Sequence, residues 1–253
     1  MLTDRVSREK EAYDEGDVWQ ESDKLHKRFW HVFECRDTRE ALQYYQDALA
    51  HYSQAAIILD YGCYDGEQTA ELLELGPKKI IGIDISEKAI RDAKNRFKGN
   101  RKTSFKTMDA HNMDFKDETF DLVAGKAILH HLDYERAIDE IERVLKPGGH
   151  AIFIEPLRDN PGGKLIRWLT PRARTEDELP LSREQIEYAN RRFGGGRHRF
   201  HNLFSVAFGM ISSLFLKKPD NFLTNIGYRL DRWLARTFMR YWMRSVVLVW
   251  EKK

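Results

Sequence analysis

The sequence has little of what cross-links, exports or anchors a chain. It holds only two cysteines in 253 residues, Cys35 and Cys63, which excludes a disulfide framework and a cysteine-rich metal cluster. The first residues are charged and lack the apolar stretch of a signal peptide. No run reaches the ~18 apolar residues that cross a bilayer. These absences together predict a cytoplasmic protein.

What is present is enough apolar material for a large core and an uneven distribution of charge. Hydrophobic residues make up 42% of the chain, which argues against disorder and suits one α/β domain with a lid or two small domains. Residues 1–150 carry 23 Lys and Arg against 30 Asp and Glu, whereas residues 151–253 carry 19 against 10. The basic third predicts either an anionic partner (phosphate, membrane surface or acidic substrate) or a solvated face.

The hydrophobic pattern changes at residue 55. Residues 1–54 are predicted to be a helical N-terminal segment, and residues 55–253 a domain with a helical insertion at about 207–244. Strands are predicted over 55–60, 79–85, 103–109, 120–128, 150–157, 197–206 and 245–251. Helices are predicted after Ser86, over 134–145 (stopped by Lys146 to Gly149) and over 182–193, with 158–181 as a long connection. Such alternation predicts a doubly wound parallel α/β sheet.

Three acidic residues fall at the ends of the first three predicted strands: Asp60, Asp84 and Asp109. Ligands bind at the carboxyl ends of parallel strands, so these carboxylates are expected at one rim. Asp84 suits the two hydroxyls of a ribose, and Asp109 with Ala110 an adenine amino group. Each acid alone is as well explained by helix capping or solvation, whereas the ordered set favours a nucleoside site.

A glycine-containing turn, Gly62-Cys63-Tyr64-Asp65-Gly66, lies between the first strand and the next helix. Small residues let the backbone approach a ligand, and the helix start offers free N–H groups. A glycine turn by itself is weak support, but it is stronger when it follows Asp60 and precedes Asp84.

The segments ILDYGCYDG, GIDIS, MDA, FDLVAGKAILHHL and LKPGGHAIFIEP resemble the class I S-adenosylmethionine-dependent methyltransferases. Within them, the chain is most similar to the bacterial group that includes the quinone-biosynthesis enzymes. The resemblance covers about residues 55–157. It implies a seven-stranded sheet of order 3-2-1-4-5-7-6 with an antiparallel last strand, and S-adenosyl-L-methionine as the cofactor.

The resemblance also implies roles for single residues. Asp60, Gly62 and Gly66 would frame the methionine part of the cofactor, and Asp84 would bind the ribose with Ile85 against the adenine. Asp109 and Ala110 would hold the adenine edge, with Lys126 beside the cofactor. One departure is Tyr64, which replaces the usual middle glycine of the turn. Its ring could crowd the methionine carboxylate.

Methyl transfer to oxygen needs alignment and, for some acceptors, a base. The candidates are His131, His130 and Glu155, which follow the fourth and fifth strands. Adjacent side chains diverge, so only one histidine is expected to face the site, and His131 is preferred. Each histidine has a structural role as its alternative, and Glu155 could orient the acceptor or cap the loop. No metal site is predicted.

The C-terminal insertion bears on the acceptor. Residues 203–216 are apolar, and Arg229, Arg232, Arg236, Arg240 and Arg244 recur at helical spacing beside an apolar face. This pattern predicts a lid over the active site, with peripheral contact with an anionic inner membrane face as the alternative.

The predicted function is methyl transfer to a small-molecule or lipid-like acceptor, on oxygen. The turn does not have the G-x-G-x-x-G spacing of a nicotinamide enzyme. A nucleic-acid methyltransferase is a further alternative, although the fourth strand ends in GKAILHH and no RNA-binding module is visible. A silent cofactor-binding or interaction protein of the same fold is the non-enzyme alternative.

Overall fold

The computed structural model describes residues 26–162, 164 and 179–253. The first helices predicted within 1–54 and most of the predicted 158–181 connection lie outside these residues. The strands are β1 (Ile57–Tyr61), β2 (Lys79–Asp84), β3 (Thr103–Thr107), β4 (Phe120–Lys126), β5 (Leu145–Pro156), β6 (Arg197–His201) and β7 (Ser245–Glu251). The α-helices are α3 (Trp30–Glu34), α4 (Arg36–Ser53), α5 (Glu67–Glu74), α6 (Glu87–Arg96), α7 (Tyr134–Val144), α9 (Arg183–Phe193), α10 (Phe204–Phe215) and α11 (Phe222–Leu234). Two 3-10 turns, η1 (Leu129–His131) and η2 (Phe238–Trp242), complete the set.

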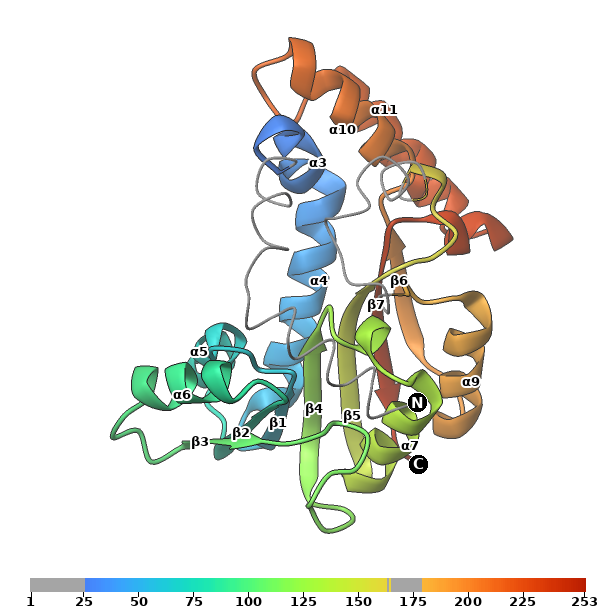
Figure 1. Ribbon diagram of the computed structural model, residues 1–253. Coiled ribbons are helices and arrows are strands. Elements are labelled where there is room, and N and C mark those ends of the chain that lie inside the picture. The colour runs from blue at the N-terminus through green and yellow to red at the C-terminus, as the bar shows by residue number, and fades with distance from the viewer. Residues whose placement is uncertain (1–25, 163, 165–178) are drawn as a thin grey trace.

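The strands form one seven-stranded sheet of order β3-β2-β1-β4-β5-β7-β6, as the sequence predicted (Figure 1). β1 pairs in parallel with β2 on one side and with β4 on the other. The chain therefore adds strands in one direction up to β3 and in the opposite direction from β4, so the strand order reverses between β1 and β4. β7 runs antiparallel to both β5 and β6, also as predicted. A reversal of strand order opens a crevice at the carboxyl ends of the strands, which is where ligands bind in such sheets.

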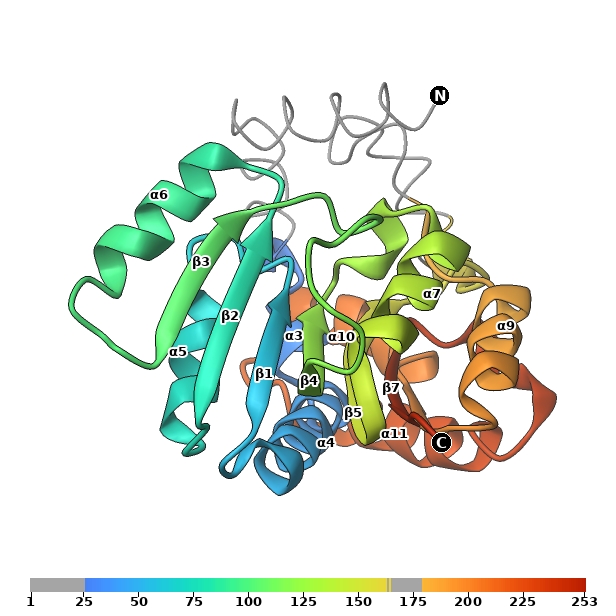
Figure 2. The same ribbon diagram turned by 90° about the horizontal axis from the view of Figure 1, so that it is seen from below.

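Helices cover both faces of the sheet, with α4, α5 and α6 on one side and α7 and α9 on the other (Figures 1 and 2). Successive strand residues point to opposite faces, so Ile58 joins Tyr45 and Leu49 of α4, whereas Leu59 joins Ile138 of α7. Because α4 shares this core, residues 36–53 pack as part of the same body as the sheet.

Local signals set several element ends. Ser86 caps α6 by accepting from Ala89 N, and Ser182 with Gln185 forms a capping box on α9. The predicted stop at Lys146 to Gly149 is wrong in detail. α7 ends at Val144, and Leu145 already pairs with Phe120 of β4. The next pair is Leu122 with His150, so the Lys-Pro-Gly-Gly segment bulges out of β5.

The predicted C-terminal insertion is helical, and α10 and α11 lie side by side at one end of the molecule (Figure 1). They cross closely at Gly227, where a Cβ would lie 2.7 Å from Ser205 N. The predicted single stripe of arginines is wrong, because α11 ends at Leu234 and the chain passes through a turn into η2. No helix in the described parts of the chain combines the length and apolar character that a membrane span requires.

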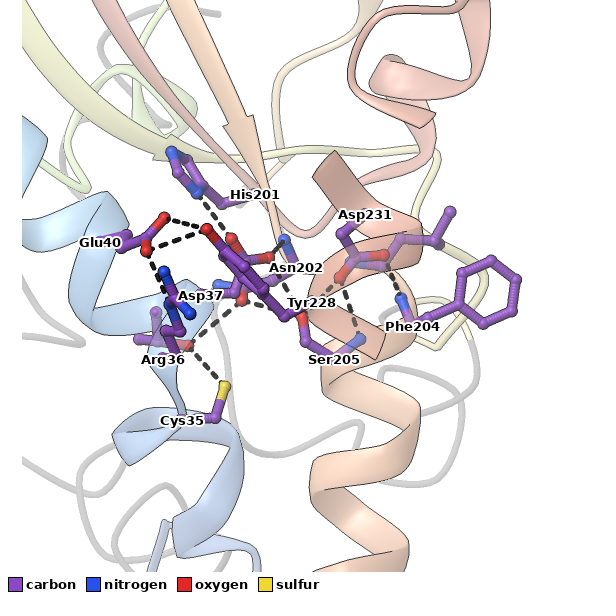
Figure 3. A network of polar contacts seen from close by, with 12 residues as sticks. Cys35, Arg36, Asp37, Glu40, His201, Asn202, Phe204, Ser205, Tyr228 and Asp231 are labelled. Carbon is purple, nitrogen blue, oxygen red and sulfur yellow. Dashed lines mark hydrogen bonds and ion pairs between the residues drawn. The ribbon is translucent and has the colours of Figure 1, made fainter. Parts of the chain in front are cut away.

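A buried polar network joins the insertion to α4 (Figure 3). Asp37 of α4 accepts from Asn202 N at 2.7 Å, and its other oxygen lies 2.9 Å from His201 Nδ1. Asp231 of α11 accepts from Phe204 N at 2.7 Å and from Ser205 Oγ at 2.6 Å. Asp37 therefore fixes the end of β6 and the start of α10 onto α4, and Asp231 joins the start of α10 to α11.

Candidate active site

A cavity of about 950 Å³ opens at the carboxyl ends of β1, β2, β4 and β5. Six of the eight residues predicted to bind the cofactor line it: Gly62, Asp84, Ile85, Asp109, Ala110 and Lys126. All three catalytic candidates line it as well: His130, His131 and Glu155. The other two predicted residues, Asp60 and Gly66, do not appear in its wall. The fold thus gathers groups from five separate loops around one space.

The turn after β1 reaches the cavity through residues in the left-handed region. Gly62 has φ +75° and Tyr64 has φ +46°, so the tyrosine takes the conformation that glycine adopts without strain. Its side chain is exposed and lines the cavity. The substitution of the usual glycine therefore leaves the shape of the turn intact and adds a ring at its edge.

Asp84 lies between this turn and the start of α6. Its Oδ2 accepts from Tyr64 N at 3.0 Å and its Oδ1 from Ser86 N at 2.9 Å. Backbone N–H groups thus hold the carboxylate at the cavity wall, next to Ile85. A carboxylate beside an apolar side chain is chemically suited to ribose hydroxyls and an adjoining base.

Asp109 lies two residues beyond β3, because the strand ends at Thr107 rather than at the predicted residue 109. One oxygen accepts from His111 N and lies 2.7 Å from His111 Nδ1. His111 Nε2 accepts from Asp133 N at 2.9 Å, so the ring proton is on Nδ1. Sequence reasoning missed His111, although the spacing Asp-x-His after a strand is a signal that could have found it.

Asp60 is fully buried behind the turn and acts on residues that do reach the cavity. It accepts from Gln68 Nε2 at 2.8 Å and from Thr69 Oγ1. Burial raises the pKa of this carboxyl to about 6. Gln68 lines the cavity and also accepts from Tyr45 OH at 2.7 Å. Asp60 and α4 therefore position Gln68, which the sequence did not single out.

Glu155 at the end of β5 is buried, with its side chain 0% exposed, and is fully engaged by the β4 loop. One oxygen accepts from Ile128 N and Leu129 N at 2.8 and 2.9 Å, and the other lies 2.7 Å from His130 Nδ1. Glu155 was expected either to orient the acceptor or to cap the loop, and the structure shows it capping the loop after β4. The carboxylate also orients the His130 ring.

His130 and His131 both line the cavity, contrary to the expectation that only one would. They lie in the 3-10 turn η1, and their ring centroids are 4.1 Å apart with a 40° angle between planes. The tight turn brings the two side chains together instead of separating them. In the part of the chain that the structure describes, no cluster of three or more His, Cys, Asp or Glu side chains is arranged to hold a metal ion.

The remaining wall comes from segments that the sequence left without a role. Phe33, Thr38, Ala41 and Leu42 of the α3–α4 region line the cavity, and so do Asn202 and Arg244. Of the described residues of the predicted insertion, only Arg244 contributes to the wall, because α10 and α11 pack on α3 and α4 instead. Covering the site by the insertion itself stays a prediction.

The methyltransferase domain family matches residues 59–153. The demethylmenaquinone methyltransferase of Lactococcus lactis is 38% identical over 103 residues, which are 39% of this chain and 41% of that protein. The O-methyltransferase cnsE of Penicillium expansum is 31% identical over 114 residues, 43% of this chain and 41% of that protein. The matched region spans less than half the length of these two curated relatives.

Solved structures share the fold. The N-methyltransferase NodS of Bradyrhizobium japonicum, in complex with S-adenosyl-L-homocysteine, superposes with a TM-score of 0.56 at 17% identity, over 93% of this chain and 98% of that one. The [4+2]-cyclase SpnF gives 0.56 at 20% identity, over 82% and 79%. Residues 59–153 therefore form a methyltransferase domain, and the strand order of the whole sheet is that of the class I S-adenosylmethionine-dependent methyltransferase fold.

Proposed function

We propose that this chain transfers the methyl group of S-adenosyl-L-methionine to an oxygen of a small or lipid-like acceptor. One observation carries the proposal: a single cavity is lined both by Asp84 and Asp109 and by the His130–Glu155 pair. A nucleoside site and an oriented base at one cavity are the two parts that methylation of a hydroxyl needs.

The residues present fit the cofactor by their chemistry. Asp84 would accept from the ribose hydroxyls, with Ile85 against the adenine, and Asp109 with Ala110 would take the adenine edge. Asp109 has one oxygen on His111 and a side chain 38% exposed, which leaves acceptor capacity for an amino group. The turn at Gly62 would face the methionine part, with Asp60 and Gly66 supporting it from behind and Lys126 beside it.

Bound S-adenosylmethionine supplies an electrophilic methyl on a sulfonium, so the protein's task is alignment, exclusion of water and removal of a proton. Glu155 accepts from His130 Nδ1, which makes Nε2 the basic nitrogen of the ring. His130 Nε2 would take the hydroxyl proton as the oxygen attacks. The Glu155 carboxylate would then stabilise the imidazolium.

His130 is therefore the better candidate base, whereas the sequence favoured His131. The buried carboxylate contacts the ring of His130 and fixes its tautomer. His131 lies next to it in the wall and is assigned contact with the acceptor. Changing His130 to Ala is expected to lower turnover by about 10²–10⁴-fold, the usual contribution of a positioned base.

The activity test measures S-adenosylhomocysteine release against a panel of hydroxylated acceptors. His130→Ala should lose most turnover while keeping cofactor affinity, and Glu155→Gln should shift the pH profile of kcat because the imidazolium loses its partner. His131→Ala is the matched control and should act mainly on KM. Full activity of His130→Ala would remove it as the base, and loss in His131→Ala alone would restore the assignment made from sequence.

Cofactor binding is tested by calorimetric titration of the full chain with S-adenosylmethionine, S-adenosylhomocysteine and NAD. Heat is expected from the first two only. Binding of NAD alone would overturn the proposal. Binding of both sulfur ligands with no turnover on any acceptor would favour the silent alternative. The [4+2]-cyclase SpnF is an example of this fold in a protein with another named activity.

The choice of oxygen is supported by relatives. One is named an O-methyltransferase, another is the 27-O-demethylrifamycin SV methyltransferase of Amycolatopsis mediterranei, and a third is a malonyl-[acyl-carrier protein] O-methyltransferase from a Marinomonas strain. Product analysis by mass spectrometry with a labelled methyl group would decide between an oxygen, a nitrogen and a carbon acceptor.

We further propose that the insertion touches an anionic membrane surface. Ten of the thirteen exposed large hydrophobic residues lie within 204–242, nine of them in the insertion, so this region is the main apolar surface of the described chain. We call it the apolar ridge, and its residues are Phe204, Ile211, Leu214, Phe215, Phe222, Ile226, Leu230, Trp233, Phe238 and Trp242. Exposed cations accompany it: Lys217, Lys218, Arg229, Arg236 and Arg240. Aromatic side chains beside cations complement anionic lipid.

Vesicle co-sedimentation tests the ridge. Wild-type protein should sediment with phosphatidylglycerol-containing vesicles at low salt, and less with pure phosphatidylcholine or at high salt. The double variant Phe215→Ser, Trp233→Ser should lose most binding, whereas Leu179→Ser, an exposed apolar residue outside the ridge, should not. Absence of sedimentation at low salt would contradict the membrane proposal.

A further inference from the structure

The cavity extends along the sheet beyond the residues assigned to the cofactor. In the strand order, the loops after β1, β2 and β3 hold Gly62, Asp84 and Asp109 at one end. The loops of β4 and β5, with His130 and Glu155, come next. Arg244 and Asn202 come from the β7 and β6 side, at the other end. The base candidate thus lies between the cofactor rim and a corner that holds a cation.

Arg244 is the unusual member of this corner. Its guanidinium lies over the ring of Phe33, 4.8 Å from the centroid, and forms no ion pair or hydrogen bond with any residue in the described ranges 26–162, 164 and 179–253. Burial lowers its pKa, opposed only by the Cys35 thiol. Arginine stays charged in proteins, so this is a cation at a cavity wall without a carboxylate partner among the residues that the structure describes.

The two buried carboxylates of the adjoining β5 and α4, Glu155 and Asp37, already have other partners. Glu155 accepts three hydrogen bonds from the β4 loop and His130, and Asp37 binds His201 and Asn202. Arg244 is partly buried. A partly buried cation without a counter-charge is unfavourable, and such groups are concentrated where a ligand supplies the missing charge.

The corner is also held rigidly. Arg244 N donates to His201 O at 3.1 Å and to Asn202 O at 2.8 Å, and Asn202 takes a left-handed φ of +72°. Asp37 fixes that segment through Asn202 N and the His201 ring (Figure 3). The backbone that carries Arg244 is therefore positioned before any ligand arrives, which lowers the entropy lost on binding.

Apolar side chains separate this cation from the cofactor rim. Phe33, Ala41 and Leu42 line the cavity from the α3–α4 region, and Ile128 and Leu132 line it from the β4 loop. A ligand that spans the space meets these apolar side chains and His130 in the middle and a cation at the end.

We infer that Arg244 binds an anionic group, a carboxylate or a phosphate, at one end of an otherwise apolar methyl acceptor. Only the identification of this ligand as the methyl acceptor rests on the proposed function. Anion binding at Arg244 is a property of the cavity by itself. Arginine recognises both groups through paired N–H donors, and anchoring one end of the acceptor would hold its hydroxyl beside His130.

The test uses full-length protein saturated with S-adenosylhomocysteine and titrated with octyl phosphate, octanoate and octanol. The two anions should bind at least about tenfold more tightly than the alcohol, and their order tells phosphate from carboxylate. Arg244→Met should weaken both anions by roughly 10- to 100-fold and leave octanol unchanged. Arg229→Met, which removes an exposed arginine of α11, is the matched control and should behave as wild type.

A second variant and a comparison of ligands distinguish an anion site from a role of Arg244 in folding or in cofactor binding. Arg244→Lys keeps the charge and should lose less affinity than Arg244→Met, and it serves if the Met variant does not fold. Equal binding of octanol and the anions to wild type would overturn the inference. So would a fall in S-adenosylhomocysteine affinity equal to the fall in anion affinity, since Arg244 would then belong to the cofactor. If wild type binds the anions but no sulfur ligand, the proposed function fails and the anion site stands.

Discussion

One cavity contains two regions that are held by different kinds of contact. The first is the proposed cofactor rim, at Asp84 and Asp109, and the second is the corner at Arg244 and Asn202. At the rim, Asp84 binds the backbone of Tyr64 and Ser86, and Asp109 binds His111. At the corner, Asp37 binds His201 and Asn202, which are more than 160 positions away in the chain. The rim is made of short-range contacts that follow each strand, whereas the corner exists only once both halves of the chain have folded together.

The region that matches the family contains one of these two regions but not the other. It covers residues 59–153, which include the rim and the His130 loop and stop short of Glu155, Asn202 and Arg244. The part that matches the family thus holds the proposed nucleoside site and the two histidines, whereas Arg244, proposed to bind an anionic end of the acceptor, lies outside it. Substitutions in the two regions should therefore affect different properties.

The largest expected effect is loss of stability at the corner. Asp37→Ala leaves Asn202 N and the His201 ring buried without their partner, so the free energy of unfolding should fall by about 3–5 kcal/mol. Urea denaturation measures this. Asp47→Ala, an exposed residue of the same helix, should change it by less than about 0.5 kcal/mol. Equal effects of the two substitutions would mean that the buried contacts of Asp37 contribute no more to stability than an exposed residue does.

The second prediction concerns pH and Asp60 behind the rim. Burial raises its pKa from 3.8 to about 6, so the folded protein keeps this proton over a range where the unfolded chain has lost it. The free energy of unfolding should therefore fall by up to about 3 kcal/mol as pH rises from about 4 to about 6, and then level off. Asp60→Asn should remove this component, whereas Asp65→Asn in the adjacent turn should not. Parallel pH profiles for wild type and Asp60→Asn would contradict it.

The third prediction reverses the first, because at the rim a substitution should affect binding more than stability. Asp84→Ala should weaken S-adenosylhomocysteine binding by about 1.5–3 kcal/mol, the contribution of a hydrogen bond to a charged group. Calorimetry measures it, with Asp65→Ala, also in the cavity wall, as the control. A dissociation constant that does not change would remove Asp84 from the site.

The smallest effect is expected at Tyr64. A left-handed conformation such as that of Tyr64 costs a non-glycine residue about 1–2 kcal/mol, which glycine avoids. Glycine also makes the unfolded chain more flexible, and this offsets part of the stability gained. Tyr64→Gly should therefore stabilise the protein by up to about 1 kcal/mol in thermal or urea unfolding. Tyr64→Ala keeps the strained backbone and should not stabilise. Equal stability of all three would mean that the turn carries no strain.

The sequence predicted elements well where local chemistry decides. Ser86 caps a helix where expected, the helix predicted over 182–193 is present from Arg183 to Phe193, and the last strand begins at Ser245 as predicted. It failed at Lys146 to Gly149, where pairing with β4 turns an expected helix stop into a strand bulge. It also failed for the arginine stripe, because a regular spacing does not reveal that α11 ends at Leu234.

The sequence by itself determined the alternation of strands and helices and the acids that follow the first three strands. These are set by backbone periodicity and by residues a few positions apart. Only the tertiary structure decided that His130 rather than His131 meets Glu155 and that Asp60 supports Gln68 from behind. It also decided that Arg244 lies at the cavity wall with no carboxylate partner among the described residues. Burial and the choice of partner are properties of surfaces brought together by folding, and no local pattern encodes them.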